Sequence, residues 1–312
     1  MRPNKRQESY KKPEVERTRI ALQDFINANK VSRVTVARGI GMSHSVVSQF
    51  LNEKYTGEVD DVAKHIDSWL IKQREKANSK SIAANYVPTT VSRRVREILR
   101  IAHIHSETVV LIGQAGLGKT TALKAYKAEN PDAIMLDTDP TFTAKIMMQN
   151  LAVAIGEDPF LPLHPLSESI INRLKDSGRV ILVDEAENLP LRALELLRRL
   201  HDKAGVGLVL AGMPRLMVNL RGKNGELKQL YSRVGFKLDM GDAMPDDDLR
   251  MIVDKALPGA EEDVALEFVS AANGNTRRLS KLISGVTRMS HINGDIEITT
   301  DMVRQFKEML IN

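Results

Sequence analysis

The chain of 312 residues contains no cysteine, which excludes disulfide bonds and thiolate metal sites. It also lacks an apolar run close to the roughly 20 residues that a membrane-spanning helix requires. The first residues, MRPNKRQESYKK, are charged and no apolar segment follows them, so they do not match a secretory signal. These absences predict a soluble cytoplasmic protein that has no membrane partner.

What is present is the composition of an ordinary globular protein, with 42% hydrophobic and 27% charged residues. The length suits two or three domains. The net charge of +5 is unevenly distributed: residues 1–80 contain 16 Lys and Arg against 10 Asp and Glu, whereas residues 81–312 contain 29 against 30. A basic segment on a nearly neutral body is typical of a nucleic-acid-binding module attached to a larger protein.

The basic segment carries apolar residues at helical spacing, interrupted by short polar breaks. The predicted helices are Glu14–Asn29, Arg33–Gly39, Ser43–Glu53 and Val59–Glu75. The stretch from Arg33 to Asn52 resembles the helix-turn-helix family, with Ala37 as the small residue of the first helix, Gly41 at the turn and Val47 as the anchor of the second helix. The other positions predicted to be buried are Val36, Ile40, Met42 and Phe50.

This resemblance implies a second helix that binds in the major groove of double-stranded DNA, with Ser43 as its cap. The residues predicted to contact DNA are Arg33, Ser43, His44, Ser45, Ser48 and Gln49. Short polar side chains on the second helix favour weak or sequence-tolerant binding over tight recognition of one operator. The alternative is a small helical core that contacts only protein.

A glycine-rich motif follows a β-branched apolar run at Glu107–Ile112 and precedes a helical pattern over Thr121–Ala128. The motif, Gly113-x-x-x-x-Gly118-Lys119-Thr120, matches the phosphate loop, and strand–loop–helix is the context that this loop requires. Backbone N–H groups would surround the phosphates of ATP or GTP, Lys119 would neutralise their charge and Thr120 would bind Mg²⁺. The predicted nucleotide-binding residues are Gly113, Gln114, Ala115, Gly116, Leu117, Gly118, Lys119, Thr120 and Thr121.

A second motif supports the same site. The run RVILVDE, residues 179–185, predicts a buried parallel strand that ends in two carboxylates. Asp184 would hold the Mg²⁺ through water, and Glu185 would orient and polarise the water that attacks the terminal phosphate. The pair therefore predicts a hydrolase and not only a nucleotide-binding protein.

The remaining patterns define the fold class, which is predicted to be α/β. Further strands are predicted at Ala133–Asp137, Gly207–Ala211 and Phe236–Met240, and their alternation with helices specifies a parallel sheet covered on both faces. After Pro245 only helices are predicted, at Asp246–Leu257, Glu261–Ala272, Thr276–Ile292 and Thr299–Leu310. Residues 76–90 show no helical period and contain Pro88, which predicts a flexible linker. The predicted organisation is an all-α helix-turn-helix domain (1–75), a linker (76–90), a P-loop core (91–244) and a helical lid bundle (245–312).

A sheet domain followed by a helical lid resembles the AAA+ ATPases, and the resemblance covers about residues 90–312. It implies that Arg233, in QLYSRV, reaches into the nucleotide site of a neighbouring subunit, and that Arg277, in GNTRRL, contacts the γ-phosphate of its own subunit. One position departs from the family pattern. Met213 stands where AAA+ proteins usually carry a polar residue that positions water, and a thioether performs that role poorly. This departure predicts slow hydrolysis of ATP to ADP and phosphate.

Taken over its whole length, the chain resembles the phage Mu B transposition protein family. The resemblance is carried by NEKYTG at residues 52–57, HPLS at 164–167, LVDEAENL at 182–189, GLVLAG at 207–212 and LYSR at 230–233. It implies an ATP- and Mg²⁺-dependent protein that forms helical filaments on double-stranded DNA, chooses the target for transposition and stimulates a DDE transposase. Such a protein is encoded by a phage or prophage and acts in the cytoplasm of the bacterial host.

The same resemblance implies that Tyr126, Lys127 and Arg173 line the DNA channel of the core. For Tyr126, ordinary packing between helix and sheet is an equal alternative. A basic helix face is formed by Arg93, Arg94, Arg96 and Arg100, and the sequence leaves open whether it faces DNA or solvent.

Three other functions compete with a transposition protein. A helicase-loader type ATPase, or a helper ATPase of an insertion sequence, shares the core but usually lacks the N-terminal helix-turn-helix. A transcriptional regulator would use nucleotide to switch an operator-binding dimer, and would protect one sequence instead of coating any duplex. A secretion-associated AAA+ protein is usually linked to a membrane.

Overall fold

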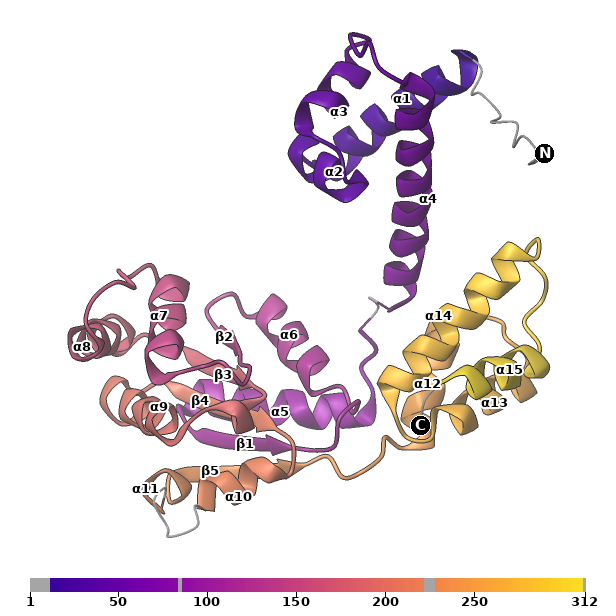
Figure 1. Ribbon diagram of the computed structural model, residues 1–312. Coiled ribbons are helices and arrows are strands. Elements are labelled where there is room, and N and C mark those ends of the chain that lie inside the picture. Colours follow the sequence, from indigo (N-terminus) through magenta and orange to yellow (C-terminus); the bar gives the residue numbers. More distant parts are fainter. Residues whose placement is uncertain (1–11, 84–85, 222–227, 311–312) are drawn as a thin grey trace, which may run out of the picture. The chain divides into compact units, whose positions relative to one another are not determined.

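The computed structural model describes residues 12–83, 86–221 and 228–310. The chain forms two compact units, Met1–Ser81 and Ile82–Asn312 (Figure 1). The hydrophobic core of the N-terminal unit is separate from the two clusters that form the core of the second unit. Within the described ranges, no helix is both long and apolar enough to cross a bilayer.

The N-terminal unit consists of helices. They are α1 (Lys12–Asn29), α2 (Arg33–Ile40), α3 (His44–Leu51) and α4 (Val59–Ala83). The side chains predicted to be buried in α2 and α3, namely Val36, Ala37, Val47 and Phe50, are at most 3% exposed. Ile40 and Met42 are only partly buried and pack at the edge of the same core.

The turn between α2 and α3 has the geometry that its glycine predicts. Gly41 has φ +77°, a left-handed conformation that glycine adopts without steric cost. The N–H of Met42 donates to the carbonyl of Ala37 at 3.0 Å, which closes the end of α2. Ser43 then begins α3, because its hydroxyl accepts from the N–H of Val46 at 3.3 Å. Two short helices therefore meet at a fixed angle around residues 41–43.

The prediction of a non-helical linker is wrong for residues 76–83. Helix α4 continues to Ala83, and the next helix, α5 (Thr90–His105), begins two residues after Pro88. The first half of the linker, KANSKSIA, lacks an apolar stripe, but its Lys, Ser and Ala residues are compatible with a helix that extends from a folded core. Proline acts where expected, because no helix passes through position 88.

The second unit contains a five-stranded sheet. Its strands are β1 (Thr108–Ile112), β2 (Ile134–Asp137), β3 (Val180–Asp184), β4 (Gly207–Gly212) and β5 (Val234–Asp239). Their spatial order is β2-β3-β4-β1-β5 and every pairing is parallel. All five strands are predicted from the sequence, and no boundary differs from its prediction by more than two residues. The α/β fold class is thus confirmed.

Helices cover both faces of this sheet. Alternate residues of the strands, such as Val109 and Leu111, pack with α5 and α6 (Lys119–Glu129). The intervening residues, such as Val110 and Ile112, pack with the helices of the opposite face. Those helices are α7 (Ala144–Ile155), α8 (Leu163–Leu174), α9 (Leu191–Ala204) and α10 (Arg215–Arg221). Two short elements, the 3₁₀ turn η1 (Ala186–Asn188) and α11 (Lys228–Tyr231), complete the connections.

The C-terminal helices form a lid that shares a core with the sheet. They are α12 (Asp246–Ala256), α13 (Glu262–Ala272), α14 (Thr276–Ile292) and α15 (Thr300–Met309). Phe268 of α13 is fully buried in the cluster that also contains Val109 and Leu111 of β1. Asp248 of α12 is 1% exposed, and its two carboxylate oxygens accept from the N–H groups of Thr90 and Val91, each at 2.8 Å. The lid is therefore tied to the start of α5.

Candidate nucleotide site

The phosphate loop lies between β1 and α6, where the motif predicts it. Gly116 and Gly118 have φ of +84° and +86°, so the backbone of the loop depends on glycine at both positions. A side chain at Gly116 would also collide with Asn275 of the lid. The first N–H groups of α6 point into this turn, and they form the anion-binding end of the helix dipole.

Lys119 is the first residue of α6 and folds over the loop. Its ammonium donates to the carbonyl of Gly113 at 2.7 Å and to that of Gln114 at 2.9 Å. These bonds hold the cation at the place where phosphates would sit. A phosphate group could take over the same hydrogens, because the lysine side chain is flexible and carries three donors.

The electrostatic surroundings of Lys119 come from distant parts of the chain. Burial lowers the pKa of the Lys119 ammonium below its ordinary value. The carboxylates of Glu187, Asp184 and Glu185 oppose that shift, in decreasing order, while the guanidinium of Arg277 adds to it. The structure thus brings together five charged groups around the loop, four of which are predicted from the sequence. A desolvated cation that lacks full compensation is a ready site for an anion.

Asp184 and Glu185 end β3 at the carboxyl edge of the sheet. Asp184 is 2% exposed; its Oδ1 accepts from the N–H of Glu185 at 3.1 Å, and its Oδ2 has no hydrogen-bond partner among the described residues. Glu185 has φ +52°, an unusual conformation for a residue with a side chain. Thr138, just after β2, stabilises this turn by donating its hydroxyl to the carbonyls of Asp184 and Glu185 at 2.8 and 2.9 Å.

These residues fit a magnesium ion that is bound together with nucleotide. The hydroxyl of Thr120 and the unpaired carboxylate oxygen of Asp184 are the hard oxygen ligands that Mg²⁺ prefers. No group of three or more acidic or histidine side chains in the described residues could hold a metal alone. Phosphate oxygens and water would therefore supply the other ligands, as is usual for Mg²⁺.

Three residues that the sequence patterns do not single out, Asn188, Arg215 and Glu187, form a chain of contacts that reaches Glu185. Asn188 donates from Nδ2 to Glu185 Oε2 at 3.1 Å and accepts at Oδ1 from Arg215 Nη2 at 3.0 Å. Glu187 is buried, and its Oε2 has no hydrogen-bond partner in the part of the chain that the structure describes. The only local signal is the spacing in DEAEN, which places Asn188 one turn after Glu185.

The lid closes one side of the phosphate loop. Thr276 donates both its N–H and its hydroxyl to the carbonyl of Gly116, at 2.8 and 2.6 Å. Asn275 donates to the carbonyl of Ala115 at 3.3 Å and caps α14 by accepting from the N–H of Arg278 at 3.1 Å. Arg277 follows directly and is exposed, so the structure places the arginine predicted to contact the γ-phosphate beside the loop.

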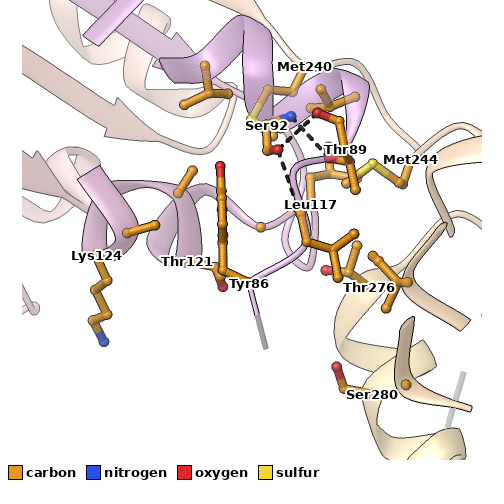
Figure 2. Close-up of a pocket in the computed structure, with 18 of the residues that line it drawn as sticks. Tyr86, Thr89, Ser92, Leu117, Thr121, Lys124, Met240, Met244, Thr276 and Ser280 are labelled. Atoms are coloured by element: carbon orange, nitrogen blue, oxygen red, sulfur yellow. Dashed lines mark hydrogen bonds between the residues drawn. The ribbon is translucent and has the colours of Figure 1, made fainter. Parts of the chain in front are cut away.

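A largely apolar cavity of about 430 Å³ adjoins the loop at Leu117 and Gly118. Figure 2 shows residues of the phosphate loop, α5, α6 and the lid gathered around it. Its apolar lining includes Val87, Val91, Met240, Met244, Ile252 and Ile283. A slot of this kind suits the flat ring of a nucleobase. None of these side chains is predicted as a binding residue, because each belongs to an ordinary apolar pattern in its own element.

Arg233, predicted to act in a neighbouring subunit, lies away from the phosphate loop of its own chain. It precedes β5, its side chain is 54% exposed, and its Nε donates to Asp202 Oδ1 of α9 at 3.0 Å. Asp202 also accepts from Arg198 at 2.7 Å. Exposed ion pairs of this kind are weak, so the guanidinium can exchange its partner.

The residues predicted to bind DNA fall into two groups. On α3 and at its start, Ser43, His44, Ser45 and Gln49 are exposed, and Ser48 is partly exposed and accepts from Arg33 Nη1 at 3.3 Å. These side chains form a continuous polar face, as the helix-turn-helix pattern predicts.

The three core residues differ from one another. Tyr126 is 4% exposed, and its hydroxyl is hydrogen-bonded to His103 Nδ1 at 3.0 Å, which favours packing over DNA contact. Lys127 donates to the carbonyls of Pro131 and Ala133 and so secures the loop before β2. Arg173 is 64% exposed, with Glu157 at 3.8 Å, and remains accessible to a phosphate.

On the helix face whose role the sequence leaves open, Arg93, Arg94 and Arg100 are exposed, whereas Arg96 is partly buried and pairs with Glu129. These contacts are compatible with both roles of this helix face, binding of DNA and exposure to solvent.

Comparison with known proteins agrees with this geometry. A family model described as AAA domain matches residues 103–220. The structure of this chain resembles that of the ORC2 protein of Aeropyrum pernix, with a TM-score of 0.57 and 17% identity. It also resembles Cdc6p of Pyrobaculum aerophilum, with a TM-score of 0.59 and 16% identity. Each likeness covers 74% of this chain and 71% of the other. The second unit therefore has the same α/β fold as these proteins, and the part of it that carries the phosphate loop matches the AAA domain model.

Curated relatives found by sequence give a more specific likeness than the solved structures do. The ATP-dependent target DNA activator B of Escherichia phage Mu is 26% identical over 297 residues, which are 93% of this chain and 94% of that protein. The Mu-like prophage FluMu DNA transposition protein B of Haemophilus influenzae is 27% identical over 218 residues, 68% of this chain and 76% of that one. The predicted resemblance is confirmed: over most of its length, this chain is similar to proteins named ATP-dependent target DNA activator B and DNA transposition protein B.

Proposed function

We propose that this protein is a DNA-binding ATPase that assembles on double-stranded DNA, selects the target for transposition and activates a DDE transposase. The observation that carries the proposal is the joining of two sites in one chain. One is a nucleotide site that contains Lys119, Asp184, Glu185 and Arg277; the other is a polar helix face on a separate basic unit. The match to the Mu target DNA activator extends over both units.

Each residue of the nucleotide site has a separate role in binding or hydrolysing ATP. Lys119 and the N–H groups of the loop bind the phosphates, while Thr120 and Asp184 hold Mg²⁺, which neutralises charge on the transferred phosphoryl group when it is bound. Glu185 accepts a hydrogen bond from the attacking water and orients it towards the γ-phosphate. The apolar cavity beside Leu117 excludes water from the base. With Met213 at the end of β4, turnover is slow, as suits a switch.

DNA binding and assembly depend on many weak contacts. Ser45, Ser48 and Gln49 are short, so each copy contributes a few hydrogen bonds or phosphate contacts and little sequence preference. A row of copies adds these contacts and gains affinity by effective concentration. ATP bound at one subunit attracts Arg233 of the next, which exchanges Asp202 for the γ-phosphate. Hydrolysis removes that attraction and lets subunits leave, and the transposase acts on this filament in the cytoplasm of the bacterial host.

Negative-stain microscopy on a non-specific linear duplex tests the proposal. The wild-type protein is compared with ATP, with ADP and without nucleotide, and Lys119→Ala serves as the nucleotide-binding control. Continuous filaments that form only with ATP support the proposed role in selecting the target for transposition. Closed rings or discrete particles would favour a helicase loader, and protection of one sequence by a dimer would favour a transcriptional regulator.

A further inference from the structure

The carboxylate of Glu185 is hydrogen-bonded to the side-chain amide of Asn188. Asn188 Nδ2 donates to Glu185 Oε2 at 3.1 Å and to the carbonyl of Thr138 at 3.4 Å. Its Oδ1 accepts from Arg215 Nη2 at 3.0 Å. Both ends of the Asn188 amide are therefore engaged, and the group links the end of β3 to the start of α10.

Arg215 determines which end of the amide faces Glu185. A guanidinium can only donate hydrogen bonds, so it selects the orientation in which the amide oxygen faces it and the NH₂ group faces the carboxylate. A rotated amide would place its oxygen against Glu185 and repel it. We propose that Asn188 and Arg215 are positioning residues for Glu185; this inference rests on the ATPase activity proposed above and names the residues that orient its water-activating group.

Arg215 is held near Asn188 by its place in the fold and by a carboxylate. It begins α10 two residues after Met213, whose thioether is at best a weak hydrogen-bond acceptor. Its Nε lies 3.8 Å from Glu187 Oε1, and the Glu187 carboxylate occupies the space beside Gly212, where any side chain would collide with Oε2. The absence of a side chain at Gly212 therefore leaves room for the Glu187 carboxylate, which attracts the Arg215 guanidinium. Arg215 thus lies between the Glu187 carboxylate and the Asn188 amide, and its contact with Glu185 runs through that amide.

The test compares Asn188→Ala, Arg215→Met and Arg215→Lys with wild type. Arg192→Met, which removes an exposed arginine at the start of α9, is the matched control. Two quantities are measured besides turnover: the affinity for ATPγS, which resembles the ground state, and the affinity for ADP with aluminium fluoride, which resembles the transition state. Thermal melting of each variant confirms that it folds.

If Asn188 and Arg215 position Glu185, their substitution should lower turnover and transition-state affinity but leave ground-state affinity nearly unchanged. Asn188→Ala and Arg215→Met should lower kcat about tenfold to a hundredfold, the range typical of residues that orient a reacting group. The affinity for ADP with aluminium fluoride should fall by a similar factor, whereas that for ATPγS changes less than about twofold. Arg215→Lys, which keeps a donor-only cation, should lose less than Arg215→Met, and Arg192→Met should match wild type.

Two results would overturn the inference. Equal losses of ATPγS affinity and turnover in Arg215→Met would mean that Arg215 contacts the nucleotide itself. Wild-type turnover in Asn188→Ala would show that Glu185 needs no amide partner. A wild-type protein that binds ATP but never hydrolyses it would instead contradict the proposed function, and the aluminium fluoride affinities would still decide whether the network prepares the transition state.

Discussion

The nucleotide site and the polar face of α3 use polar groups in opposite ways. Around the phosphate loop, Asp184 and Glu187 are almost completely buried, and each has a carboxylate oxygen without a hydrogen-bond partner among the described residues. On α3, Ser45 and Gln49 are exposed and short. Buried charges are costly and fixed in place, so removing one has a large effect. Exposed groups cost little and contribute little, and they gain effect only when many copies act together.

The largest effect should come from Lys119→Ala, which removes the cation at the centre of the nucleotide site. ATP binding and ATP-dependent coating of DNA should both be lost, because the ammonium that neutralises the phosphate charge is then missing. Binding of a fluorescent ATP analogue and microscopy measure the two losses. Lys145→Ala, an exposed lysine on α7, is the control. Coating that still required ATP in Lys119→Ala would refute the assignment of the loop.

Glu185→Gln should separate binding from hydrolysis. The amide keeps the shape of the side chain but cannot take up the proton or hold the charge of a carboxylate, so phosphate release should fall by about a hundredfold or more. ATP stays bound, and filaments on DNA should persist longer after free ATP is removed. Phosphate release and filament lifetime are the measurements. Unchanged turnover would remove Glu185 from the reaction.

Arg233→Ala should affect assembly and leave the single subunit intact. The exposed pair with Asp202 contributes about 0–1 kcal/mol to folding, so the free energy of unfolding should hardly change. ATP affinity should remain within about twofold of wild type, since the arginine belongs to the neighbour's site. Filaments should be absent. Arg198→Ala, which breaks the other contact to Asp202, is the control, and an equal defect there would trace the effect to Asp202.

A smaller effect is expected from the paired change Ser45→Glu with Gln49→Glu. Two negative charges facing phosphates should weaken DNA binding about tenfold at low salt, and the salt dependence should change with them. The control, Asn27→Asp with Ala28→Glu, adds the same charge to exposed positions of α1. Equal losses in both pairs would mean that net charge matters and that α3 has no special role.

The smallest effect should be that of Gly41→Ala at the turn. Alanine at φ +77° costs about 1 kcal/mol, because its Cβ disfavours the left-handed region. Gly41→Asn should cost less, since asparagine tolerates this conformation. Urea unfolding measures both. Equal stability of the alanine variant would show that the turn relaxes without glycine.

The parts of the molecule that are predictable from sequence are those that depend on local patterns. Apolar runs such as Val180–Val183 locate the strands, and the glycines of the phosphate loop fix its backbone. The helical extension of α4 escapes prediction because residues 76–83 carry no stripe that faces a core. Asn188 and Arg215 escape it as well, since 27 residues separate two side chains whose roles arise only when β3 and β4 lie side by side.

The carboxylate of Asp248 has a consequence for how the chain unfolds. It joins α12 to the first turn of α5, and a single apolar cluster runs from β1 through α13 to α15. Sheet and lid therefore cannot lose their packing independently, and residues 86–310 should melt in one cooperative transition. The N-terminal unit has a core of its own and should melt separately, so calorimetry should resolve two events where the domain pattern in the sequence suggests three.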